Sequence, residues 1–167
     1  EGVSVGRPEG TYMLFVDCTE WCKKHGKTIE DVEKAIKIAQ KAPTACNRQA
    51  SKVYLYKDKA TNDALGELIA GNTGFQQEVP NYLVVTADVS AFYDTFERNQ
   101  VYVEAGLFSM ALVEALHYYG IGSCILQNGE YYKKNKKFKE ICKNIPENER
   151  IILFVATGYY KNKFSYA

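Results

Sequence analysis

The sequence contains little histidine, proline or tryptophan, and charge of neither sign predominates. Two histidines, four prolines and one tryptophan occur among 167 residues, and 21 basic residues face 20 acidic ones, which leaves a formal net charge of +1. Proteins that bind nucleic acid or an anionic membrane surface usually carry a clear basic excess, so neither partner is predicted. Two histidines also leave little support for hydrolytic triads or histidine-rich metal centres.

Several motifs of common catalytic sites are absent. The sequence has no P-loop and no His-Glu-x-x-His pattern. The segment GIGSC at 120–124 contains Gly-x-Gly, but it lacks the third glycine of a dinucleotide fingerprint and precedes a predicted strand. His117 falls near the end of an apolar helical stretch, where we expect it to serve packing and not catalysis.

The five cysteines fit neither a disulfide framework nor a zinc site, because their number is odd and their spacing is irregular. Cys18 and Cys22 could share one helical face, but only His25 lies nearby and no second pair completes a tetrahedral set. We therefore predict no metal ligands, reduced thiols and a cytoplasmic location. The N-terminal EGVSVGRPEG has no apolar core behind a basic start, so a signal peptide is not predicted.

Long uninterrupted apolar runs are also missing. The most apolar stretch, residues 101–120, contains Glu104, Glu114 and His117, which favours a buried core helix over a membrane span. With 46% hydrophobic and 25% charged residues, the composition is that of an ordinary folded protein, and the length suits one well-packed domain.

Apolar periodicity predicts strands interleaved with helices. Thr28 is a candidate N-cap for a helix that Pro43 stops, and Gly120 is a candidate C-terminal residue of the long helix. The irregular connections favour an α+β fold with a mixed sheet flanked by helices over a doubly wound sheet. The expected strands are 11–17, 52–57, 82–88, 122–127 and 151–160, and the expected helices are 28–42, 61–70, 98–119 and 134–144.

An unusually polar turn connects the first helix to the second strand. It lies within KAPTACNRQASKVYLY, residues 41–56, and holds a threonine, an asparagine, an arginine and a glutamine. Such side chains can simply cap backbone groups of the turn. Amide side chains can equally offer donors and acceptors to a ligand. The residues alone leave both interpretations open.

Together with later segments, this turn resembles a known pattern. APTACNRQ is similar to the Pro-[Ser/Thr]-x-x-Asn-x-Gln turn of the nitroreductase family of flavoproteins, and GNTGF at 71–75 resembles the asparagine-bearing loop of that family. YLVVTAD, RNQVYVEAGLFSMALVEALHYYGIGSCIL and IILFVATGYY then follow in the family's order. The resemblance spans roughly residues 28–160 and implies a nitroreductase-like domain over 28–167.

The resemblance implies FMN bound at the interface of a homodimer, with the polar turn of one subunit against a flavin held largely by the other. Amide groups suit the edge of the flavin ring, which alternates hydrogen-bond donors and acceptors. Because the cofactor would carry out the redox chemistry, no catalytic side chain is predicted. The implied cofactor-binding residues are Thr44, Asn47 and Gln49 in the turn, Asn72 in the loop, and Gln127, Asn128 and Gly129 after the fourth strand.

Two features depart from the family. Ala50 and Ser51 stand where the family usually has proline and an aromatic residue. The window in which the family carries Arg-Arg-Ser-x-Arg, which grips the flavin phosphate, reads FVDCTEW here, with Asp17 and Glu20 in place of arginines. A second basic contact of the family lies beyond the closing strand, where this chain stops at Ala167.

The N-terminal residues carry a different resemblance. RPEGTYMLFVDCTEWCKKHGKT, residues 7–28, looks like the C-terminal small domain of pyridoxal-phosphate-dependent aminotransferases, without the cofactor lysine of those enzymes. We therefore expect residues 1–27 to form an atypical N-terminal segment with an aminotransferase-like strand, ahead of the nitroreductase-like domain.

The resemblance implies an FMN-dependent NAD(P)H oxidoreductase. Such an enzyme reduces nitroaromatic, quinone or related small-molecule acceptors by hydride transfer through the flavin. The alternative is a non-catalytic or chimeric protein that keeps the nitroreductase fold and binds flavin weakly or not at all. The polar turn and the asparagine loop favour the enzyme, whereas the missing arginines favour the alternative.

Overall fold

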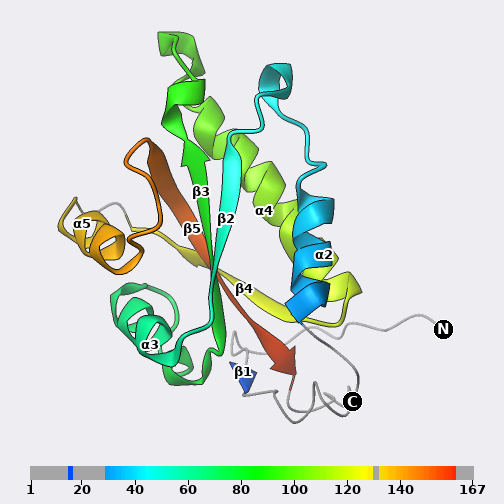
Figure 1. The fold of residues 1–167 in the computed structure, drawn as a ribbon, viewed down its shortest axis with the longest axis vertical. Helices are drawn as coiled ribbons and strands as arrows, with labels where there is room; N and C mark the ends of the chain where they lie inside the picture. Colours follow the sequence, from blue (N-terminus) through cyan, green and yellow to red (C-terminus); the bar gives the residue numbers. More distant parts are fainter. Residues whose placement is uncertain (1–14, 17–28, 130–131, 161–167) are drawn as a thin grey trace.

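The computed structural model describes residues 15–16, 29–129 and 132–160, and Figure 1 shows their arrangement. Most elements lie close to the ranges predicted from apolar periodicity. The strand expected at 11–17 is described only at Phe15 and Val16. The elements are β1 (Phe15–Val16), α2 (Ile29–Ala39), β2 (Ser51–Tyr56), α3 (Lys59–Leu68), β3 (Asn81–Asp88), α4 (Gln100–Tyr118), β4 (Gly122–Gln127), α5 (Tyr132–Ile141) and β5 (Glu149–Tyr160).

The strands form one sheet in the order β1-β5-β3-β2, and β4 also pairs with β5. The α+β class and the flanking helices are confirmed. The sheet was expected to be mixed in direction, but all strand pairs in the described ranges are antiparallel. Connections that include a helix do not by themselves fix strand direction, since the chain can return to the sheet from either end.

The β3 strand is buried on both faces, as its continuous apolar sequence predicts. Side chains alternate across a strand, so Leu83 and Val85 pack with α2 and α4, whereas Tyr82 and Val84 pack with α3 and α5. Figure 1 shows the two helix pairs on opposite sides of the sheet. Two hydrophobic clusters, one on each face, therefore hold the domain together.

The long helix α4 is buried on one side only. Ala105, Phe108 and Leu112 point into the core that α4 shares with α2 and the sheet. Val103, Leu107 and Met110 are about half exposed, at 52%, 45% and 53%. A surface helix usually presents polar residues outward, so the half-exposed apolar face of α4, formed by these three residues, is unusual.

The N-terminal segment 1–27, with its aminotransferase resemblance, lies outside the described residues apart from β1. Thr28, the expected N-cap of α2, also lies outside them. No helix in the described ranges is both long enough and apolar enough to cross a membrane.

Candidate functional site

The polar turn between α2 and β2 has an unusual backbone. It includes a short 3-10 turn at Ala45–Asn47, and the φ angles of Cys46, Asn47 and Gln49 are 52°, 55° and 53°. Residues other than glycine rarely adopt positive φ, and each such residue costs roughly 1–3 kcal/mol unless its surroundings impose the conformation. Three of them in one turn indicate that neighbouring contacts hold this turn in a specific shape.

The three side chains predicted for this turn lie together. Nε2 of Gln49 donates to Oδ1 of Asn47 at 2.9 Å, and the backbone N–H of Gln49 donates to Oγ1 of Thr44 at 3.2 Å. Asn47 and Gln49 are both exposed. Within the described part of the chain, Nδ2 of Asn47 and Oε1 of Gln49 have no hydrogen-bond partner. One donor and one acceptor thus remain for a ligand.

Two acidic side chains that were not predicted to belong to the site hold this turn. Glu104 of α4 is 1% exposed, and its Oε1 accepts from the backbone N–H of Ala45 at 2.7 Å. Oε1 of Glu97 accepts from Nη1 of Arg48 at 2.6 Å. A carboxylate within an apolar helix was the available signal for Glu104, because a buried charge needs a partner. The sequence does not show which partner that is.

Asn72 is buried and hydrogen-bonded within its own loop. It is 4% exposed, and its Nδ2 donates to the backbone oxygen of Gly66 at 2.7 Å and lies 3.4 Å from Oη of Tyr82. Gly71 and Gly74 on either side have φ angles of 87° and 95°, which favour glycine. The loop therefore has its own structural use for Asn72, in addition to the flavin contact that the resemblance implies.

We expect Asn72→Ala to lower the free energy of unfolding of the flavin-free protein by about 1–2 kcal/mol, because a buried hydrogen bond is lost. The midpoint of urea denaturation measures this change. Thr73→Ala, at the exposed neighbouring position, is the control and should stay near the wild-type value. Unchanged stability of Asn72→Ala together with weaker FMN binding would assign Asn72 to the ligand alone.

The segment after β4 lies near the Asn72 loop. A Cβ atom placed on Gly71 would lie 3.8 Å from Cδ2 of Leu126, the residue before Gln127. Nδ2 of Asn128 donates to the backbone oxygen of Ile151 at 2.9 Å and to Oδ1 of Asn135 at 3.1 Å. Oδ1 of Asn128 is buried and has no partner within the described residues. Gln127 is exposed and Gly129 is half-buried.

The polar turn and the Asn72 loop lie at opposite ends of the β2–β3 pair. The turn directly precedes Ser51, which pairs with Ala87, whereas Asn72 approaches Tyr82. Ala87 and Tyr82 are five residues apart on β3, which is about 17 Å along a strand. In Figure 1 the turn lies beyond the upper end of β2, and the Asn72 loop follows α3 near the lower end. One chain therefore does not bring all the predicted residues into one site.

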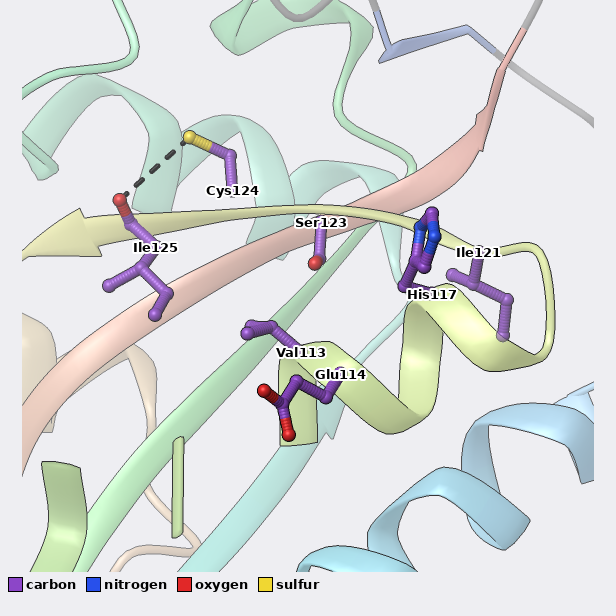
Figure 2. Close-up of a pocket in the computed structure, with 7 residues that line it drawn as sticks. All are labelled: Val113, Glu114, His117, Ile121, Ser123, Cys124 and Ile125. Carbon is purple, nitrogen blue, oxygen red and sulfur yellow. Dashed lines mark hydrogen bonds between the residues drawn. The ribbon is translucent and has the colours of Figure 1, made fainter. Parts of the chain in front are cut away.

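A pocket of about 490 Å³ opens between the second half of α4 and β4 (Figure 2). Burial raises the pKa of the Cys124 thiol in its wall, which keeps the thiol protonated near neutral pH. His117 was expected to serve packing, but it is exposed and lines this pocket. The lining residues are Val113, Glu114, His117, Ile121, Ser123, Cys124 and Ile125.

The described residues contain no group of three or more side chains placed to ligate a metal ion. The sheet and the two pairs of helices on its faces define an α+β domain. The sequence profile of the nitroreductase family matches residues 28–159, and this chain belongs to that family.

Solved structures share the fold at low sequence identity. A nitroreductase family protein from Streptococcus pneumoniae is 24% identical, with a TM-score of 0.69, and the match covers 84% of each chain. An FMN-dependent nitroreductase from Clostridium difficile is 20% identical, with a TM-score of 0.68, covering 82% of this chain and 79% of that one. A nitroreductase family protein from Clostridium novyi is 19% identical, with a TM-score of 0.70, covering 81% and 75%. A comparison with curated protein sequences gave no match.

Proposed function

We propose that this chain is a cytoplasmic, FMN-dependent NAD(P)H oxidoreductase that acts as a homodimer and reduces nitroaromatic, quinone or related small-molecule acceptors. Bound FMN would supply the redox chemistry by taking up a hydride from NAD(P)H and passing the electrons on. Membership of the nitroreductase family supports this class, and a relative of the same fold is named for its dependence on FMN. Free thiols at Cys46, Cys124 and Cys142 suit a reducing compartment.

The observation that carries the proposal is the polar turn. Its exposed amides at Asn47 and Gln49 leave one donor and one acceptor unsatisfied, and its strained backbone is imposed by contacts from α4 and the preceding segment. Three residues with positive φ in one turn favour a site whose shape matters for binding. The amides fit the alternating donors and acceptors of a flavin edge, and the orphaned Oδ1 of Asn128 fits a donor approaching the segment after β4.

The chain's own residues would bind and orient the ring. Asn47 and Gln49 would hydrogen-bond its edge from one subunit, while Gln127, Asn128 and Gly129 would line it from the other. Thr44 would keep Gln49 in place through the hydrogen bond to its backbone N–H. Asn72 would lie with Gln127, Asn128 and Gly129 on the other subunit, because its loop lies near Leu126. This division follows from the separation of the two groups within one chain, which two symmetric copies could bring together.

The apolar face of α4, formed by Val103, Leu107 and Met110, supports the dimer. We expect Met110→Glu to weaken dimerisation at least a hundredfold, because an unpaired charge would be buried in the interface. Light scattering over a dilution series measures the change. Val89→Glu, at an exposed valine outside this face, is the control and should remain dimeric. A wild-type protein that is a stable monomer at micromolar concentration would contradict the dimer.

FMN binding and NAD(P)H oxidation distinguish the proposed flavin enzyme from the alternative, a non-catalytic or chimeric protein of the same fold. We expect the purified protein to quench FMN fluorescence saturably and to oxidise NADH or NADPH when a nitroaromatic or quinone acceptor is added. The double variant Asn47→Ala/Gln49→Ala should bind FMN roughly tenfold or more weakly, since each lost hydrogen bond costs on the order of 1 kcal/mol. A folded wild-type protein that does not bind FMN would favour the non-catalytic or chimeric alternative.

A further inference from the structure

Arg48 occupies a variable position of the polar turn, yet it makes more contacts than the turn residues of the motif. Its Nη1 donates to Oε1 of Glu97 at 2.6 Å, and the guanidinium lies 5.6 Å and 5.1 Å from the ring centroids of Phe92 and Tyr93. The side chains of Arg48 and Glu97 are only 17% and 11% exposed. A guanidinium that lies over aromatic rings and also makes a charge-assisted hydrogen bond combines contacts for which arginine is better suited than lysine.

These contacts fasten the turn to the segment between β3 and α4. Phe92 packs against the core cluster shared by α2, α4 and the sheet, so Arg48 connects the turn to a fixed part of the domain. Glu104 holds the other end of the turn through the N–H of Ala45. The residues with positive φ lie between and beside these two attachment points. Strained backbone persists only where surrounding structure imposes it.

The buried carboxylate of Glu97 depends on Arg48. Its Oε2 is buried and has no partner among the described residues, so Arg48 supplies its charge compensation. A buried carboxylate that loses its cation is strongly unfavourable, which would push the segment and the turn apart when Arg48 is removed.

We propose that Arg48 is a positioning residue that clamps the polar turn in the shape in which Asn47 and Gln49 can contact flavin; this inference rests on the proposed function. Arg48 itself would not contact the flavin ring. If the clamp is lost, only part of the population keeps the competent turn, and the apparent dissociation constant rises by the inverse of that fraction. A turn that is competent one-tenth of the time would bind FMN about tenfold more weakly.

The test uses the full chain and two independent measurements. Hydrogen exchange in the flavin-free protein measures how often the turn opens, because the backbone N–H groups of Ala45, Asn47, Arg48 and Gln49 are all hydrogen-bonded. FMN fluorescence titration reads the consequence for binding. If the turn of Arg48→Ala is competent about one-tenth of the time, its amides are mostly open, so they should exchange nearly as fast as unstructured amides while FMN binds about tenfold more weakly.

Further variants distinguish a clamp from general loosening. Arg48→Lys keeps the charge but not the planar guanidinium, so it should restore part of the FMN affinity that Arg48→Ala loses. Glu97→Gln keeps an acceptor for Arg48 but removes the charge, so it should reproduce part of the Arg48→Ala effect, and the double variant should add little to Arg48→Ala. Lys59→Ala, which removes the exposed ion pair with Asp63, is the matched control and should alter neither reading.

The possible outcomes distinguish the role of Arg48, the contact between the turn and flavin, and the proposed function. Unchanged exchange in Arg48→Ala would overturn the clamp, whatever the protein binds. Exchange as fast as in unstructured amides together with unchanged FMN affinity would overturn the link between the turn and flavin. A wild-type protein that does not bind FMN would overturn the proposed function, and with it the ligand assigned to the turn, while the exchange data would still judge the clamp.

Discussion

Replacing Glu149 by alanine is expected to lower the free energy of unfolding by about 3 kcal/mol, which is more than a hundredfold in the folding equilibrium. Glu149 is 1% exposed at the start of β5. Its Oε1 accepts from Nζ of Lys52 at 2.7 Å, and its Oε2 accepts from Oη of Tyr54 at 2.9 Å and Oγ1 of Thr86 at 2.6 Å. The carboxylate therefore connects β2, β3 and β5, and its removal leaves two hydroxyl groups without their partner.

Urea denaturation at a fixed protein concentration measures this loss, because dimerisation would make the midpoint depend on concentration. Asp63→Ala removes an exposed ion pair with Lys59 and should change the stability by less than about 0.5 kcal/mol. A Glu149→Ala protein as stable as the wild type would contradict the role given to this buried carboxylate.

The same residue predicts a pH dependence. Burial opposes ionisation of Glu149, but the hydrogen bonds from Lys52, Thr86 and Tyr54 outweigh it and hold the pKa of Glu149 below its ordinary value of 4.5. A lowered folded-state pKa gives stability that is present above the unfolded pKa and is lost as the pH falls through the folded pKa. Glu149→Gln should therefore lose less stability than the wild type when the pH falls below about 4.5.

The second large effect concerns the flavin phosphate. We expect FMN to bind on the order of a hundredfold or more weakly than in a family member with two phosphate-binding arginines, and riboflavin to bind nearly as well as FMN. Charge-assisted hydrogen bonds contribute roughly 1.5–3 kcal/mol each, and the window that should hold arginines contains Asp17 and Glu20. Parallel fluorescence titrations with FMN and riboflavin measure the preference.

A gain-of-function variant sharpens this test. Asp17→Arg/Glu20→Arg should strengthen FMN binding tenfold or more and leave riboflavin binding unchanged, because only FMN carries the phosphate. Asp17→Asn/Glu20→Gln is the matched control for lost repulsion without gained donors. A wild-type protein purified with near-stoichiometric flavin and a strong preference for FMN would show that a phosphate site exists elsewhere in the chain.

The sequence predicted the fold better than the site. The continuous apolar strand of β3 has a pattern that few other environments allow, so its position and burial could be inferred. The helix α4 was expected to be a buried core helix, and its apolar sequence did not show that one apolar face would be half exposed. The antiparallel direction of every described strand pair could not, because it depends on how distant segments meet. The polar turn was recognisable from its residue types, but its positive φ angles and the contacts of Arg48 with Phe92 and Glu97 depend on residues far away in the sequence.

The measurement that tests the central claim most directly is FMN binding by mixed dimers. One variant, Asn47→Ala/Gln49→Ala, removes the amides of the turn, and the other, Gly129→Leu, adds a bulky side chain to the segment after β4. Each variant alone should bind FMN poorly.

If each flavin site combines the turn of one subunit with Asn72, Gln127, Asn128 and Gly129 of the other, every mixed dimer has one intact site and one doubly defective site. Equal amounts of the two variants, unfolded and refolded together, should then recover about one site in four with wild-type affinity, because about half of the dimers are mixed. No recovery from a mixture shown to contain mixed dimers would contradict a site shared between two subunits.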